Sequence, residues 1–110
     1  MYDKELAARL RDELAGVAGV TEKAMFGGLA FLVNGNMAVS AASRGGLLLR
    51  VDPADTAALV DGVDGVARFE MRGREMDGWL RVEPEVVAAD ESLAVWAAYG
   101  VRYASSLPPK

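Results

Sequence analysis

The sequence predicts an α+β domain in which helices pack against an antiparallel sheet of about five to six strands. The main observation is Asn34-Gly35 between two apolar runs. This is the strongest short-range signal for a β-hairpin, because a type I′ turn needs positive φ at both central residues. The first connections between expected strands are short, which favours antiparallel neighbours, since a parallel pair needs a crossover of about a dozen residues or more. The expected order is helix, four strands, helix, two strands, helix.

Three segments have the features of helices. The first is expected over Asp3–Ala15, where four apolar residues recur on one helical face: Leu6, Leu10, Leu14 and Val17. A second, short helix begins after Asp52, which can cap it, and Pro53, which suits the first helical position. The last helix is expected over Asp90–Ser106, with Asp90 as its N-cap.

The expected strands come in two groups. In chain order, the expected strands are Glu22–Phe26, Leu29–Val33, Met37–Ala41, Gly46–Val51, Ala67–Met71 and Trp79–Val82. Gly27-Gly28 joins the first two, and we interpret it as a bulge or a tight strand junction. A phosphate-binding loop is the less favoured interpretation, because such loops lead into a helix. Arg72–Gly78 is expected to be a longer connection bounded by glycines.

The composition excludes several classes of function. The chain has 110 residues, which suits one domain, and it contains no cysteine and no histidine. Disulfides, thiolate catalysis, Ser-His-Asp chemistry and His-ligated zinc are therefore impossible within it. The net charge of −4 argues against nucleic-acid binding by bulk attraction to phosphates. No apolar run approaches the length of a membrane span and the N-terminus has no signal-peptide pattern, so we expect a cytoplasmic location.

One combination of motifs resembles a known family. It consists of Met25-Phe26-Gly27-Gly28 with the hairpin through Asn36-Met37, the stretch from Phe69-Glu70-Met71 to Gly78-Trp79, and the closing Tyr103–Lys110. Together these motifs are similar to the N-terminal domain of the TfoX/Sxy family, over nearly the whole chain. The resemblance implies a two-layer fold of the secretion-chaperone class. It also implies kinship with bacterial regulators of natural competence, which act as transcriptional co-regulators beside a cyclic-AMP-responsive activator.

Full-length members of the family carry a second, helical domain, so a chain that ends at Lys110 is expected to be a stand-alone N-terminal domain spanning residues 1–110. The resemblance brings no set of catalytic residues with it. We therefore expect a non-enzymatic domain without cofactor or metal that works through protein–protein contacts. The partner is unidentified, and a homodimer is an open alternative. Neither direct nucleic-acid binding nor membrane binding is expected.

Two groups of residues are the candidates for this role. Phe26, Gly27 and Gly28 are expected to set the backbone geometry at the strand junction. Arg72, Arg74 and Trp79 on the later hairpin are expected to supply contacts, because an aromatic residue on an exposed sheet face is typical of an interface hot spot. Taken by themselves, the tryptophans Trp79 and Trp96 are most simply interpreted as core residues, one on a strand and one on a helix.

The carboxylates allow a second hypothesis. Glu70, Glu75 and Asp77 are close in sequence, and a small-ligand-binding protein or a carboxylate-dependent enzyme would need them to converge on a cavity. Surface ion pairs with the neighbouring arginines are the favoured interpretation. Asp55, Asp61 and Asp64 lack the spacing of an EF-hand, so we interpret them as solvated acids rather than as a calcium site.

Overall fold

The computed structural model describes residues 2–110. Its elements are, in chain order, α1 (Lys4–Glu13), β1 (Val20–Met25), β2 (Gly28–Val33), β3 (Asn36–Ala41), β4 (Leu47–Arg50), the 3₁₀ helix η1 (Pro53–Asp55), α2 (Thr56–Gly62), β5 (Val66–Met71), β6 (Arg74–Val82), the 3₁₀ helix η2 (Pro84–Val87) and α3 (Asp90–Ser106). The strands form one six-stranded sheet in the order β1-β2-β3-β4-β6-β5, and every neighbouring pair is antiparallel. The predicted α+β class is confirmed.

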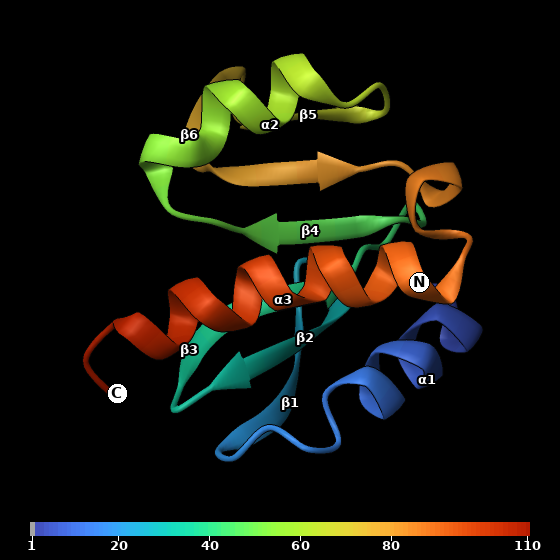
Figure 1. Ribbon diagram of the computed structural model, residues 1–110, viewed down its shortest axis with the longest axis vertical. Helices are drawn as coiled ribbons and strands as arrows, with labels where there is room; N and C mark the ends of the chain where they lie inside the picture. Colours follow the sequence, from blue (N-terminus) through green and yellow to red (C-terminus); the bar gives the residue numbers. More distant parts are fainter. Residues whose placement is uncertain (1) are drawn as a thin grey trace.

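The three helices cover one face of this sheet (Figure 1). α3 crosses β3 and β4, α1 lies beside it, and α2 packs against β5 and β6 (Figure 1). Between helices and sheet lies the main core, whose fully buried members include Leu10 of α1, Leu93 of α3, Val39 of β3 and Leu49 of β4. An ion pair links α1 to α3, because Nη2 of Arg9 in α1 lies 3.0 Å from Oδ1 of Asp90 in α3.

Three hairpins are closed by two-residue turns with positive φ at both central positions. These turns are Phe26-Gly27 between β1 and β2, Asn34-Gly35 between β2 and β3, and Arg72-Gly73 between β5 and β6. Positive φ at both positions is what a type I′ turn requires. The hairpin predicted at Asn34-Gly35 is therefore confirmed. The tight junction expected at Gly27-Gly28 lies one residue earlier, at Phe26-Gly27, because Gly28 is the first residue of β2, and the expected strand Glu22–Phe26 was wrong at its end because β1 stops at Met25.

Strand β6 departs from the prediction. It begins at Arg74 instead of Trp79, so the expected connection over Arg72–Gly78 was wrong, and only Arg72-Gly73 is a turn. The register between β5 and β6 shifts after Arg68, and this leaves Asp77, Gly78 and Trp79 opposite no residue of β5. Gly78 has a φ of 87° at this irregularity. A glycine inside a strand marks such a bulge as readily as it marks a loop.

The helix limits agree closely with the prediction, apart from their caps. α3 spans the expected residues, but Ala89 occupies the N-cap position and no side chain caps the helix, so the expected cap at Asp90 was wrong. α1 has Asp3 as its N-cap and ends at Glu13, two residues before the expected end. Asp52 caps as expected, because its Oδ1 accepts a hydrogen bond from the Ala54 amide at 3.0 Å. No helix within residues 2–110 combines the length and apolar character that crossing a membrane demands.

Candidate functional site

The sheet face opposite the helices carries a second apolar cluster, which we call the open face. Its buried members are Ala30, Met37 and Leu48, and its partly buried members are Met25, Leu32, Phe69 and Trp79. All seven residues belong to strands, whereas each of the three helices contributes apolar residues to the main core on the other side. Within residues 2–110, therefore, the open face has no helical layer of its own.

The register of the sheet creates a hollow in the open face. Ala30, Ser40, Leu48, Arg81 and Ala67 are paired in one row from β2 to β5, and Leu48 is directly opposite Arg81. Cross-strand partners point to the same side of a sheet. Because Ser40 and Ala67 are small, the larger side chains around them stand above a depression.

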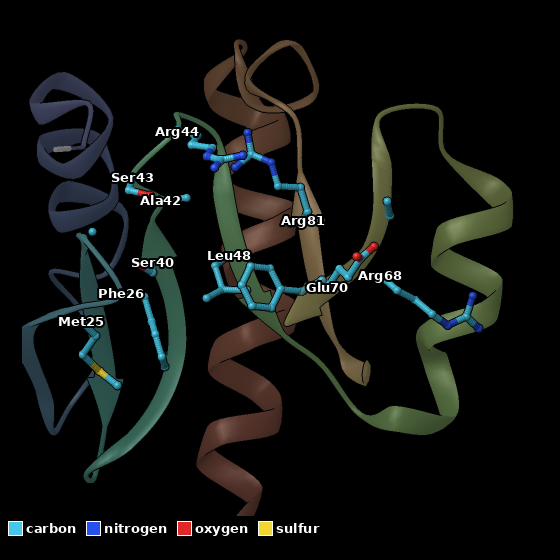
Figure 2. Close-up of a pocket in the computed structure, with 13 residues that line it drawn as sticks. Met25, Phe26, Ser40, Ala42, Ser43, Arg44, Leu48, Arg68, Glu70 and Arg81 are labelled. Carbon is cyan, nitrogen blue, oxygen red and sulfur yellow. The ribbon is translucent and has the colours of Figure 1, made fainter. Parts of the chain in front are cut away.

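This depression is a groove of about 460 Å³. Its lining includes the apolar side chains of Met25, Phe26, Leu48 and Phe69 and the cationic side chains of Arg44 and Arg81. Figure 2 shows Met25 and Phe26 on one side, Leu48 near the centre, and Arg44 with Arg81 at the end next to the β3–β4 turn. The volume lies within the range of about 300–1,000 Å³ that is typical of small-molecule sites.

An apolar pocket of about 190 Å³ adjoins the groove. Six apolar side chains line it: Phe26, Leu48, Phe69, Met71, Met76 and Trp79. The first three of these also line the groove, so the two hollows are continuous along Phe26 and Leu48. Methionines are flexible and common on adaptable binding surfaces, and two of them lie here beside aromatic rings.

Phe26 combines exposure with an unfavourable backbone conformation. Its φ is 52°, and its side chain is 61% exposed. A residue with a Cβ in the left-handed region costs about 1–2 kcal/mol compared with the right-handed conformation. Since the ring is largely in solvent, burial offsets little of that cost. Strain of this kind is concentrated at functional sites.

Arg44 and Arg81 differ in how firmly they are held. Arg81 donates from Nη1 to the carbonyl oxygen of Gly45 and from Nε to Oε2 of Glu83, at 3.1 Å, and its side chain is 25% exposed. The contact with Gly45 places its guanidinium beside the turn that carries Arg44. Among residues 2–110, Arg44 has neither a hydrogen-bond nor an ion-pair partner. One anchored and one unpaired cation therefore lie at the same end of the groove.

Comparison of the sequence with models of known protein families identifies the family to which the chain belongs. Residues 12–104 match the model of the TfoX N-terminal domain, which is most of the chain. The chain belongs to this family. The resemblance seen in the motifs is therefore confirmed, and membership of the family supports a competence or transcription co-regulator-like domain. A search of curated proteins and a search of solved structures gave no significant match.

In this TfoX N-terminal domain, the candidate contact residues divide into two places. Phe26 and Trp79 line the same apolar pocket, although Phe26 is in the β1–β2 turn and Trp79 is in β6, which β3 and β4 separate from β2 in the strand order. Trp79 stacks against Arg50, whose guanidinium carbon lies 5.0 Å from the ring centroid. Arg72 and Arg74 are exposed at the tip of the β5–β6 hairpin and line neither the groove nor the apolar pocket. The other tryptophan, Trp96, is buried in the main core.

Gly27 and Gly28 shape the edge of the groove. Gly27 has a φ of 76°, and an added Cβ would lie 3.1 Å from Cβ of Ser43. At Gly28, an added Cβ would collide with the carbonyl oxygen of Ala41 on the neighbouring strand. Both positions therefore suit glycine, because the β1–β2 turn passes close to the end of β3. A strand follows this glycine pair, so it lacks the helix N-terminus on which a phosphate-binding loop depends.

The carboxylates do not converge. Glu70 lines the groove, but Glu75 and Asp77 do not. Asp77 accepts a hydrogen bond from Nε of Arg68 at 2.9 Å, which raises the pKa of Arg68 above its ordinary value. Figure 2 shows the Arg68 side chain extending away from Arg44 and Arg81. Glu70 and Glu75 are cross-strand partners, but both are exposed and only Glu70 reaches the groove, so no enclosed site holds the pair. No group of three metal-ligating side chains occurs in the described part of the chain.

Sequence reasoning missed four residues that build the groove: Arg44, Leu48, Phe69 and Arg81. One signal for them was present. Leu47-Leu48-Leu49 is a continuous apolar run, and such runs are typical of strands that are apolar on both faces. That pattern indicates a second apolar surface, but it does not identify the arginines that border it.

Proposed function

We propose that this domain is a regulatory module of the co-regulator type, which acts by binding another protein through its open face. The observation that carries the proposal is the second apolar cluster, formed by strands alone and continued by the exposed ring of Phe26. Contiguous apolar surface of this kind marks interaction sites in proteins. Membership of the TfoX N-terminal domain family supports the regulatory part of the proposal.

Phe26 and Trp79 are the proposed anchors of the contact. Aromatic residues in partly enclosed apolar surroundings dominate the energy of many interfaces, and the residues around them mainly exclude water. Phe26 projects from a two-residue turn, and Trp79 stacks on Arg50 beside the same pocket. Arg72 and Arg74, at the nearby hairpin tip, are proposed to form the polar rim.

A matched pair of variants tests this proposal. Phe26 and Val95 are the two large apolar residues exposed in residues 2–110, at 61% and 57%, and Val95 lies on α3. Phe26→Ser and Val95→Ser therefore remove similar exposed surface from different elements. The immobilised domain and both variants are incubated with lysate of the source cells, and bound proteins are quantified by mass spectrometry.

We expect at least one protein to be captured by the wild type and by Val95→Ser, and to be lost with Phe26→Ser. The alternative partner is a second copy of this chain. Sedimentation of the purified chain over a range of concentrations measures whether it self-associates. A dimer that Phe26→Ser dissociates would identify that copy as the occupant of the open face. A strictly monomeric chain whose captured proteins are the same with Phe26→Ser as with wild type would refute the proposal.

A further inference from the structure

We infer that the groove of the open face binds a small amphipathic anion, with its charged group at Arg44 and Arg81 and its apolar part against Phe26 and Leu48. This ligand site goes beyond the proposed protein contact and does not depend on it. Three features of the groove carry the inference: an unneutralised cation, an apolar floor continuous with that cation, and a volume suited to a small molecule.

The cationic end is suited to a carboxylate or a similar anion. The carboxylate of Glu83 accepts a hydrogen bond from Nε of Arg81 and forms no ion pair with Arg44. The Arg44 side chain has no partner among residues 2–110. The contacts of Arg81 with Glu83 and Gly45 hold its guanidinium in place, and they leave Nη2 free to donate. Arginine presents its donors in a planar fork that matches a carboxylate, and such charge-assisted hydrogen bonds are stronger than neutral ones.

The positive charge at this end is local. The chain as a whole carries a net charge of −4, so the remaining surface repels anions weakly and does not attract them. Arg68 and Glu70 are the other charged residues of the groove lining, and Arg68 is paired with Asp77. Figure 2 shows Glu70 on the β5 side of the groove, away from the β3–β4 turn that carries Arg44. An anion at Arg44 therefore avoids Glu70, whereas a cation there would meet two guanidinium groups.

The apolar part of the ligand has a continuous path. Leu48, the cross-strand partner of Arg81, lines the groove next to it. Leu48 and Phe69 also line the apolar pocket, which extends to Trp79. Met25 and Phe26 border the same path on the side of the β1–β2 turn. Burial of a hydrocarbon chain along this path is favourable in proportion to the apolar area that it removes from water.

The test compares three probes that share one ten-carbon chain: decanoate, decyltrimethylammonium and decanol. Binding to the full chain is measured by calorimetry below the concentration at which the probes form micelles. Amide shifts in ¹H–¹⁵N NMR spectra locate the site. We expect decanoate to bind most tightly and to shift groove amides such as those of Gly28 and Arg44. Equal binding of decyltrimethylammonium, or shifts confined to the helical side, would overturn the inference.

Arginine variants make the test specific. Arg44→Gln should weaken decanoate binding by about tenfold or more, the usual effect of losing a hydrogen bond to a charged group. Arg102→Gln is the matched control, because Arg102 is an exposed arginine on α3 that does not line the groove, and it should leave the affinity unchanged. Equal affinities for the two variants would refute the role of Arg44. If decanoate fails to bind while protein capture still requires Phe26, the inference falls and the proposed function stands.

Discussion

Gly100 allows a decisive test of how α3 lies on the sheet. It is a helical residue, and in an exposed helix interior Gly→Ala stabilises by about 1 kcal/mol. Here we expect the opposite sign. An added Cβ would collide with the carbonyl oxygen of Ala38 and lie 2.9 Å from Cδ1 of Leu49. Ala38 lies at the register shift between β2 and β3 and has no cross-strand partner of its own. Its neighbours Met37 and Val39 are both paired with β2, and this limits how far its carbonyl can move away.

The magnitude follows from two opposing terms. Inserting a methyl group into a packed contact costs about 1–3 kcal/mol, and a rigid backbone neighbour places Gly100→Ala near the upper end. After the gain in helix propensity of about 1 kcal/mol, the net loss should be about 1–2 kcal/mol. Equilibrium unfolding in urea measures it as a lower midpoint at an unchanged m-value.

Gly62 supplies the matched control. It is the last residue of α2, and no atom lies within 4 Å of a Cβ added there. Gly62→Ala should therefore be neutral or stabilising, by at most about 1 kcal/mol. If Gly100→Ala were as stable as Gly62→Ala, α3 would not approach β3 as closely as the structure shows, and the reasoning on the main core would be wrong.

Two further predictions concern single hydrogen bonds. Thr56→Val should destabilise by about 1–3 kcal/mol, because the buried Thr56 hydroxyl accepts from the Gly78 amide at 2.8 Å and the variant leaves that donor unpaired; an unfolding midpoint equal to wild type would contradict this. Glu22→Gln should lower the midpoint slightly at pH 7, since the hydrogen bond from Arg11 holds the pKa of Glu22 below its ordinary value. This stabilisation is full above the unfolded-state pKa of about 4.3 and is lost as the pH falls through the lower folded-state pKa. The midpoints of wild type and Glu22→Gln should therefore converge in acid, and a gap that widens below pH 4 would show that the sign is wrong.

The sequence predicted best the features that neighbouring residues determine. The turn at Asn34-Gly35 and the limits of α3 depend on local conformational preferences and on helical periodicity, and both agree with the structure. The start of β6 was missed because Gly78, at a bulge inside the strand, has the same local features as a loop glycine. The sequence was therefore sufficient to predict the class of fold, but not the start of β6.

The groove was inaccessible to the sequence for a different reason. It depends on the pairing of β4 with β6, which are separated along the chain by η1, α2 and β5. That pairing brings Leu48 opposite Arg81, and the Gly45 carbonyl then fixes Arg81 beside Arg44. Local patterns carry no information about which distant strands become neighbours, so no motif could place the two arginines together.

The three two-residue turns allow a comparison within one molecule. All have positive φ at both positions, but the first residue is Asn34 in one turn and Phe26 in another. Asparagine tolerates the left-handed region far better than phenylalanine does. The backbone of the β1–β2 turn, which begins with Phe26, is therefore less favourable than that of the β2–β3 turn, which begins with Asn34. Natural sequences break a local preference mainly where function requires it. Phe26 breaks this preference and places an exposed ring beside the groove. The substitution Phe26→Asn should therefore stabilise the fold but reduce binding of the partner protein at the open face.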